Sequence, residues 1–159
     1  MTERSPKTPQ TALEYAMKIL SKRVYAESEI QSKLQKKGYS AAEIKTAVED
    51  CRRYAFLNDK RYAEDYANLL NQRGCGSLLI RRKLQMLHIA EEYIDNALAQ
   101  VAENEITAAK NSLDFKLRML KNEKDKFKKK QKIYAFLAAR GYSFDIIRTL
   151  LENYEMENL

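Results

Sequence analysis

Basic side chains are the residues of this sequence whose type and spacing could do chemistry, and that chemistry would be the binding of anions. Residues 66–90 carry four basic residues and no acidic one. A helix that buries Ile80 and Leu84 turns Arg82 outward and leaves its basic neighbours on the flanks. Guanidinium and ammonium groups placed in this way suit phosphate oxygens. In this segment we therefore predict that an anionic partner contacts Arg73, Arg81, Arg82 and Lys83.

Lysine-rich segments lie on either side of this one. Residues 121–132 hold seven lysines and two acidic residues. Such a run is either a solvated helix face or a set of phosphate contacts, because lysine is a point charge that needs no fixed geometry. The sequence leaves both interpretations open. In the two flanking segments we predict contacts with the same partner from Lys33, Lys36 and Lys37, and from Lys126, Lys128, Lys129 and Lys130.

The composition of the whole chain agrees with an anionic partner. The 159 residues include 29 basic and 22 acidic ones, which give a formal net charge of +7. This excess favours nucleic acid or a nucleoprotein surface over a membrane, although lysines could also serve only to keep helices soluble. No apolar run approaches a membrane span and no apolar segment follows the first basic residues, so we expect a cytoplasmic protein.

Catalytic chemistry is not indicated by the residue types present. The single histidine, His88, has no titratable partner at a defined spacing, and we expect it to be a turn residue with its ring at the surface. Cys51 falls on an apolar helical stripe and reads as a buried thiol, and two cysteines with one distant histidine do not make a metal site. Gly74–Gly76 lacks the lysine and the preceding strand of a phosphate-binding loop. We expect no enzymatic activity, no metal and no cofactor.

The elements that must position the basic side chains are helices. Only 4 glycines and 2 prolines occur, and alanine, leucine, lysine and glutamate are abundant, which favours an all-α protein. Both prolines lie in residues 1–10, which we expect to form a disordered tail. Capping patterns predict that helices start at Ser28, Ser40, Ser77 and Asn104.

An internal repeat of about 50 residues organises these helices. A shift of 50 places Ile30 on Ile80, and a shift of 103 places it on Ile133. The same shifts relate Leu34 to Leu84 and Leu137, Gly38 to His88 and Gly141, and Ile44 to Ile94 and Ile147. A single three-helix unit is marginal alone, whereas three in series stabilise one another. We therefore predict three tandem three-helix repeats, residues 11–57, 58–103 and 104–159, which form an elongated, curved body.

The start of the second repeat carries the most distinctive run of residues. Asn58 is expected to cap a helix, with Asp59 at the positive end of its dipole. Gly74 and Gly76 are expected to end that helix by taking positive φ. We assign a structural role to Phe56, Leu57, Asn58, Asp59, Arg61, Tyr62, Gly74 and Gly76, and Arg61 could equally form an ion pair with Asp65.

The run Phe56-Leu57-Asn58-Asp59-x-Arg61-Tyr62-Ala63, followed by Gly74-x-Gly76 and Ile80-Arg81-x-x-Leu84, resembles the central motif of the RecX family of bacterial recombination regulators. Lys37-Gly38-Tyr39 and Phe136-Leu137-x-x-Arg140-Gly141-Tyr142 extend the likeness over most of residues 13–151. Two places depart from the family pattern: Met86-Leu87-His88-Ile89 stands where a Lys-Gly-Ile turn is usual, and Asn58 where Asp is common.

The resemblance implies a chain of tandem three-helix repeats that acts in DNA recombination, DNA repair and the SOS response. It implies binding in the groove of the RecA filament on single-stranded DNA, with reduced ATPase, strand-exchange and co-protease activity. Members of the family are also reported to contact DNA, and we expect this chain to be a monomer. Two alternatives stay open: a helix-turn-helix-type DNA-binding protein that contacts mainly phosphates, and a helical scaffold for other proteins.

Overall fold

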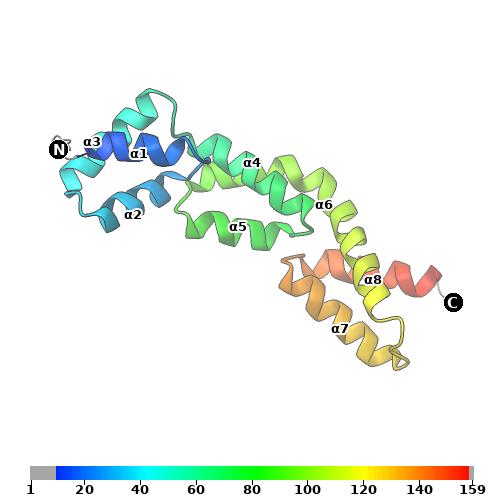
Figure 1. Ribbon diagram of the computed structural model, residues 1–159. Coiled ribbons are helices and arrows are strands. Elements are labelled where there is room, and N and C mark those ends of the chain that lie inside the picture. The colour runs from blue at the N-terminus through cyan, green and yellow to red at the C-terminus, as the bar shows by residue number, and fades with distance from the viewer. Residues whose placement is uncertain (1–9, 158–159) are drawn as a thin grey trace, which may run out of the picture. The chain divides into compact units, whose positions relative to one another are not determined.

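The structure, a computed structural model, describes residues 10–157, and within that range it contains eight helices and no strand (Figure 1). This confirms the predicted all-α fold. The predicted disordered tail lies outside the described residues apart from Gln10. The helices are α1 (Ala12–Leu20), α2 (Glu27–Lys37), α3 (Ala41–Arg53), α4 (Asp59–Gln72), α5 (Ser77–Met86), α6 (Glu91–Met119), α7 (Lys126–Ala139) and α8 (Phe144–Glu157).

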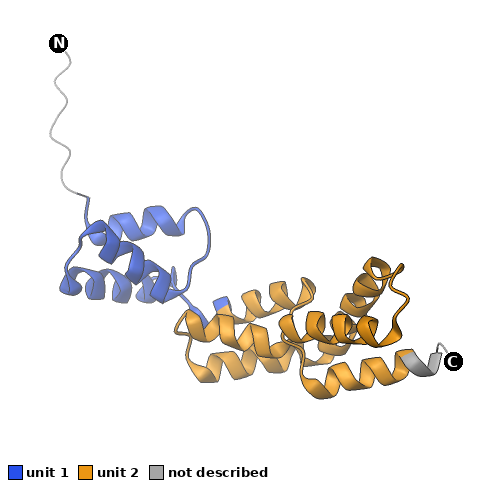
Figure 2. Cartoon of the chain, turned by 90° about the horizontal axis from the view of Figure 1, so that it is seen from below, with its two compact units in different colours: residues 1–62 blue, residues 63–159 orange. Residues whose placement is uncertain are grey.

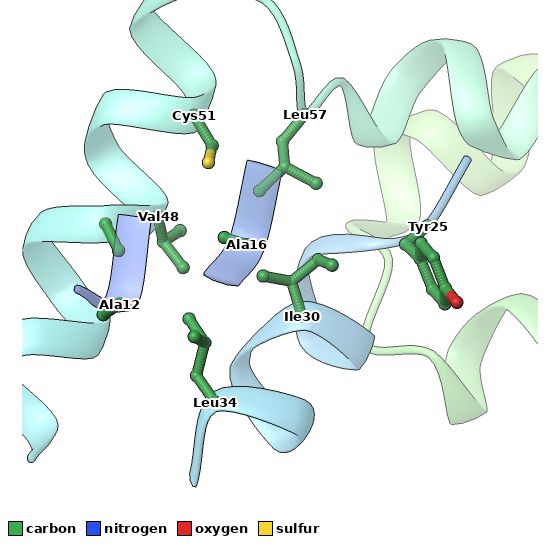
Figure 3. Close-up of a cluster of buried hydrophobic side chains, with 9 residues drawn as sticks. Ala12, Ala16, Tyr25, Ile30, Leu34, Val48, Cys51 and Leu57 are labelled. Atoms are coloured by element: carbon green, nitrogen blue, oxygen red, sulfur yellow. The ribbon is translucent and has the colours of Figure 1, made fainter. Parts of the chain in front are cut away.

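The chain divides into two compact units, residues 1–62 and 63–159 (Figure 2). In the first unit, α1, α2 and α3 pack around one core, in which Ile30 and Leu34 of α2 are fully buried against Val48 and Cys51 of α3 (Figure 3). The buried thiol predicted for Cys51 is confirmed, and burial raises its pKa.

Two apolar residues at the edges of the first unit lie outside its core. The helical spacing of the apolar residues from Leu13 onward includes Val24, but α1 ends at Leu20 and Val24 is 66% exposed. The neighbouring Tyr25 enters the core in its place. Ala55 lies beyond the end of α3 in a left-handed conformation, with φ of 57°, and is exposed.

In the second unit, the long helix α6 packs against α5, α7 and α8. The core positions predicted from the repeat are buried here, and the fully or almost fully buried members are Ile80, Leu84, Ile94, Ile133, Leu137 and Ile147. Equivalent positions of the repeat are therefore buried in all three copies, as Ile30, Ile80 and Ile133 illustrate. No helix in residues 10–157 combines the length and the apolar character needed to cross a bilayer.

A turn with the same geometry recurs in all three repeats. Gly38, His88 and Gly141 take positive φ values of 98°, 56° and 85°. In each turn the next amide donates to a carbonyl five residues earlier: Tyr39 to Leu34 at 3.3 Å, Ile89 to Leu84 at 3.2 Å and Tyr142 to Leu137 at 3.2 Å. His88 therefore holds a backbone conformation that favours glycine, and its ring is exposed as predicted.

Two predicted helix starts are displaced because other groups satisfy the first amides. Ser28 lies inside α2, whose N-cap is the fully buried Ala26, and the Glu29 carboxylate accepts from the Ala26 amide at 3.0 Å. Ser77 is the first residue of α5, not its cap. Its amide donates to the buried carboxylate of Glu105 at 2.7 Å, so a side chain from α6 caps α5.

The predicted break before Asn104 is absent. α6 runs without interruption from Glu91 to Met119, and Asn104 is an exposed residue in its middle. The surrounding residues are good helix formers with no glycine or proline, so nothing in the chain ends the helix there. The last helix of the second repeat and the first helix of the third are one element.

Candidate anion-binding surface

The start of α4 confirms part of the predicted motif. The side-chain oxygen of Asn58 accepts from the Arg61 amide at 3.0 Å, as expected for a cap. Asp59 lies in the first turn of α4, as expected, and has a second role. Its carboxylate accepts from the Glu27 amide at 2.9 Å and so caps α2. Burial raises the pKa of Asp59. Arg52 binds the Glu27 carboxylate through two hydrogen bonds of 2.6 Å, which ties α3 to the same point.

The two glycines of the motif have different roles. Gly74 takes φ of 75° after the end of α4, as predicted. Gly76 does not take positive φ, since its φ is −82°. Its amide donates to the Arg140 carbonyl at 2.8 Å, and a Cβ there would lie 2.6 Å from the amide nitrogen of Tyr142. Glycine at 76 is therefore required by the close approach of two backbones.

This contact joins the turn between α4 and α5 to the turn between α7 and α8. The Leu78 amide donates to the Gly141 carbonyl at 3.1 Å. The Arg140 guanidinium donates to the carbonyls of Arg73 and Gly74 at 2.8 and 3.2 Å. We call this contact between residues 73–78 and 140–142 the turn junction.

The lysines predicted on α2 lie in unit 1 and have structural explanations. The Lys33 ammonium lies 5.3 Å from the centre of the Tyr25 ring, and that of Lys37 lies 5.7 Å from the centre of the Tyr15 ring. Lys36 and Lys37 occupy the last turn of α2, where the helix dipole favours positive charge. Their positions would stabilise the helix whether or not an anion binds.

The basic residues predicted on α5 are not equivalent. Arg81 is bound by two acidic residues of α6, Glu91 at 2.8 Å and Asp95 at 2.5 Å, and the hydrogen bond to Asp95 raises its pKa. Arg82 is exposed, and Lys83 is half-buried. Arg81 therefore holds α5 against α6, whereas Arg82 is the α5 cation that faces solvent.

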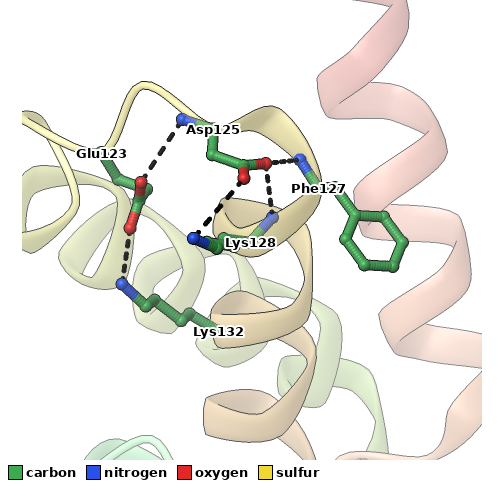
Figure 4. Close-up of polar contacts among 5 residues, drawn as sticks. All are labelled: Glu123, Asp125, Phe127, Lys128 and Lys132. Atoms are coloured by element: carbon green, nitrogen blue, oxygen red, sulfur yellow. Dashed lines mark hydrogen bonds and ion pairs between the residues drawn. The ribbon is translucent and has the colours of Figure 1, made fainter.

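The lysines predicted on α7 form the strongest concentration of charge in the second unit. A turn precedes α7, and the Asp125 carboxylate caps the helix by accepting from the amides of Phe127 and Lys128 at 3.0 and 3.1 Å (Figure 4). The helix itself, KFKKKQKIYAFLAA, carries five lysines and no acidic residue. We call Lys126, Lys128, Lys129 and Lys130 the α7 lysine cluster.

Some members of the α7 lysine cluster have polar partners within the second unit. Lys128 lies 3.9 Å from Asp125, and the Lys129 ammonium donates to the Tyr154 hydroxyl at 3.4 Å. The best-paired lysine, Lys132, lies outside the cluster and binds Glu123 at 2.5 Å, which lowers the pKa of that carboxyl (Figure 4). Lysines in the first turns of a helix meet the positive end of its dipole, so the arrangement lowers the stability of α7.

The α7 lysine cluster thus lies apart from the turn junction. Lys126 and Arg140 lie at opposite ends of α7, which at 1.5 Å per residue is a separation of about 20 Å. Arg140, at the turn junction, was not predicted as a binding residue, although its equivalence to Lys37 in the repeat was a signal for it.

Within residues 10–157 no cluster of three histidine, cysteine or carboxylate side chains could hold a metal ion.

Comparisons with known proteins agree with this architecture. Models of the first, second and third three-helix domains of RecX match residues 12–51, 58–98 and 104–151. The chain is 32% identical over 147 residues to a "Regulatory protein RecX" from Haemophilus influenzae (strain 86-028NP), which covers 92% of this chain and 96% of the relative. It is 34% identical over 134 residues to a protein of the same name from Vibrio campbellii (strain ATCC BAA-1116), with 84% and 85% covered.

Solved structures show the same fold. The crystal structure of a regulatory protein RecX aligns with a TM-score of 0.80 at 24% identity over 89% of this chain and 70% of that one. The crystal structure of RecX from Lactobacillus salivarius aligns with a TM-score of 0.79 at 21% identity, with 91% and 95% covered. With three matching domain models and relatives above 30% identity over most of their length, this chain belongs to the RecX family of regulatory proteins.

Proposed function

We propose that this protein inhibits the RecA recombinase by binding in the groove of the RecA filament on single-stranded DNA. It would lower the ATPase, strand-exchange and co-protease activities by favouring one filament state over another, since a ligand shifts an equilibrium only by its differential affinity. It would act as a cytoplasmic monomer without catalysing a reaction. Membership of a family of regulatory proteins supports this proposal, and so does the basic surface of the second unit.

The α7 lysine cluster is the observation that carries the proposal. Like charges gathered at the positive end of a helix oppose folding, by about 0.3–1 kcal/mol for each exposed charge. A sequence selected only for stability would place acidic residues in that turn, as α6 does with Glu91 and Glu92. The cost is offset when the lysines meet phosphates, and the nucleoprotein filament supplies phosphates at regular spacing.

A direct reader of duplex DNA is less well supported. The recognition helix of such a protein would be α5, and the groups suited to base edges would be Arg82 and Gln85. The amide of Gln85 is already bound to Glu91 at 2.8 Å, and Arg81 is held by the same residue. Contacts with DNA would then be made mainly to phosphates.

RecA ATP turnover on single-stranded DNA, measured with sub-stoichiometric amounts of this protein, tests the proposal. The variant Lys126→Glu/Lys128→Glu should need about tenfold more protein for half-inhibition, since each lost phosphate contact removes affinity and flattens the salt dependence. Its helix should be more stable, because the new carboxylates suit the dipole. Lost inhibition together with unchanged or raised thermal stability would assign the effect to binding.

The matched control is Lys110→Glu/Arg118→Glu, which makes the same change in charge at two exposed positions of α6. It should inhibit nearly as well as the unaltered chain. Full inhibition by the α7 variant at the same salt concentration would refute the assignment of the cluster. Equal salt-sensitive binding to naked duplex DNA, with no effect on RecA, would favour the DNA-binding alternative. Reversal of Arg82 tests α5 more cleanly than reversal of Arg81, which would also break the ion pairs with α6.

A further inference from the structure

A groove of about 520 Å³ lies in the second unit beside the turn junction. One wall is a stripe of α6 that runs from Asn104 through Asn111 to Phe115, and the other is the end of α4 at Asn71 and Arg73, with Arg140 beside it. At 1.5 Å per residue the stripe is about 16 Å long, which is the length of about five residues of extended peptide. The volume is within the range of ligand-binding clefts.

Most residues that line this groove have polar side chains, and the charge of the lining is of one sign. None of its described lining residues is acidic, and its two charged members are Arg73 and Arg140. One guanidinium nitrogen of Arg140 donates to the carbonyls of Arg73 and Gly74 in the turn junction. The guanidinium carbon lies 4.8 Å from the centre of the Phe136 ring. Phe115, which is 51% exposed, stacks on the same Phe136 at 6.3 Å. The groove therefore offers the Arg140 guanidinium near an exposed aromatic ring, and Arg73 is a second cationic residue of its lining.

Asn71 gives independent evidence that the groove is built for a polar ligand. Asn71 is only 6% exposed, and its side-chain amide nitrogen has no hydrogen-bond partner among the residues that the structure describes. An unsatisfied buried donor lowers the stability of the fold. Leucine at this position would avoid the cost, as Leu70 does beside it. Because Asn71 lines the groove, its unsatisfied donor is a candidate partner for an acceptor on a ligand.

These features distinguish a peptide from a nucleic-acid strand. A strand carries a phosphate at every nucleotide and needs cations along its whole path, but here only two of the described lining residues, Arg73 and Arg140, are cationic. The rest of the groove presents amides, which match the donors and acceptors of a peptide main chain. A ligand with one carboxylate and one adjacent apolar side chain would satisfy the arginines and cover Phe115.

We propose that this groove binds an extended segment of about five residues from a protein partner, with an acidic side chain at Arg73 and Arg140 and an apolar side chain on Phe115. The inference goes beyond the proposed function and does not depend on it. The two proposals can fail independently. The protein could inhibit RecA and bind no peptide in this groove, or it could bind a peptide here and leave RecA activity unchanged.

The test is selection from a random displayed-peptide library with the full chain, followed by fluorescence anisotropy with the synthesised peptide. The selected peptides should share an acidic residue next to an aliphatic or aromatic one. Arg73→Glu should weaken binding about tenfold or more, and Asn71→Leu about threefold or more, because they remove a charged and a neutral hydrogen bond. Asn71→Leu should keep or raise the thermal stability, which separates loss of binding from loss of fold.

Arg82→Glu is the matched control, because Arg82 is an exposed cation of the same unit that does not line the groove. Its peptide affinity should stay within about twofold of that of the unaltered chain. The proposal is overturned if no peptide is enriched, or if the enriched peptides bind Arg73→Glu as tightly as the unaltered protein. It is also overturned if a labelled oligothymidylate binds with the same dependence on Arg73 and Asn71, since the ligand would then be a nucleic acid.

Discussion

The replacement of Gly76 by alanine tests the turn junction, because the sign of its effect depends on one geometric fact. Gly76 has φ of −82°, which alanine adopts without strain. In open space the change would therefore stabilise the protein by about 0.4–1 kcal/mol, through the lower entropy of the unfolded chain. In the structure, however, a Cβ at this position would lie 2.6 Å from both the carbonyl carbon of Gly141 and the amide nitrogen of Tyr142.

The magnitude follows from what must move. Both neighbours are backbone atoms, so neither can turn aside as a flexible side chain would, and overpacking of this kind costs about 1–3 kcal/mol. Separation of the two turns would weaken the hydrogen bonds from Gly76 to Arg140 and from Leu78 to Gly141, each worth about 0.5–1.5 kcal/mol. We expect Gly76→Ala to lower the free energy of unfolding by about 2–4 kcal/mol.

Urea denaturation followed by circular dichroism measures the loss, and amide hydrogen exchange at Gly76 and Leu78 locates it. Gly38→Ala is the matched control: nothing lies within 4 Å of its added Cβ, but its φ is 98°. That variant should lose only about 1 kcal/mol, the cost of a left-handed alanine. If Gly76→Ala is as stable as the unaltered chain or more so, the close approach of the two turns is wrong.

Two further perturbations concern unit 1 and the repeated turn. Burial raises the folded-state pKa of Asp59 above its ordinary value of 3.8, so its contribution to stability is complete below that pH and is lost as pH rises through the folded pKa. Asp59→Asn keeps an acceptor for the Glu27 amide, and its stability relative to the unaltered chain should increase with pH in urea titrations; a difference that is constant or falls with pH would contradict this. His88→Gly should raise the free energy of unfolding by about 0.5 kcal/mol, because relief of the left-handed conformation exceeds the entropy added to the unfolded chain, and a loss of stability in thermal or urea denaturation would contradict the geometry of that turn.

The sequence predicted those features that depend on local spacing. Ile30, Ile80 and Ile133 are buried because the apolar period is the same in each repeat, and His88 could be placed in the turn by its alignment with two glycines. The outward direction of Arg82 followed in the same way, since the helical period alone fixes it.

The features that sequence reasoning missed depend on contacts between distant residues. Ser77 looks like a cap, but the acceptor for its amide is Glu105, 28 residues later. Arg81 looks like a solvent-facing cation, but Asp95 lies across from it on the next helix. Asparagine is a residue type that often caps helices, yet the helix continues through Asn104 because the residues on both sides of it favour helix. For Ser77 and Arg81, a partner that local spacing does not specify decided the outcome, whereas for Asn104 the helix propensity of the neighbouring residues did.

The predicted repeat boundaries and the predicted binding residues stay predictions, and so does the elongated, curved shape. The α7 lysine cluster and the turn junction belong to the same compact unit. The effects of substitutions at the two places can therefore be compared within that unit.

The carboxylate of Glu105 has a consequence for anyone who recombines members of this family. It belongs to the segment matched by the third domain model, yet it completes the first turn of a helix in the second. A chimaera spliced at residue 103 would exchange the acceptor while retaining the amide that needs it. The structural module of this chain is therefore not the stretch that repeats in its sequence, because a helix of one repeat takes the acceptor for its first turn from the next.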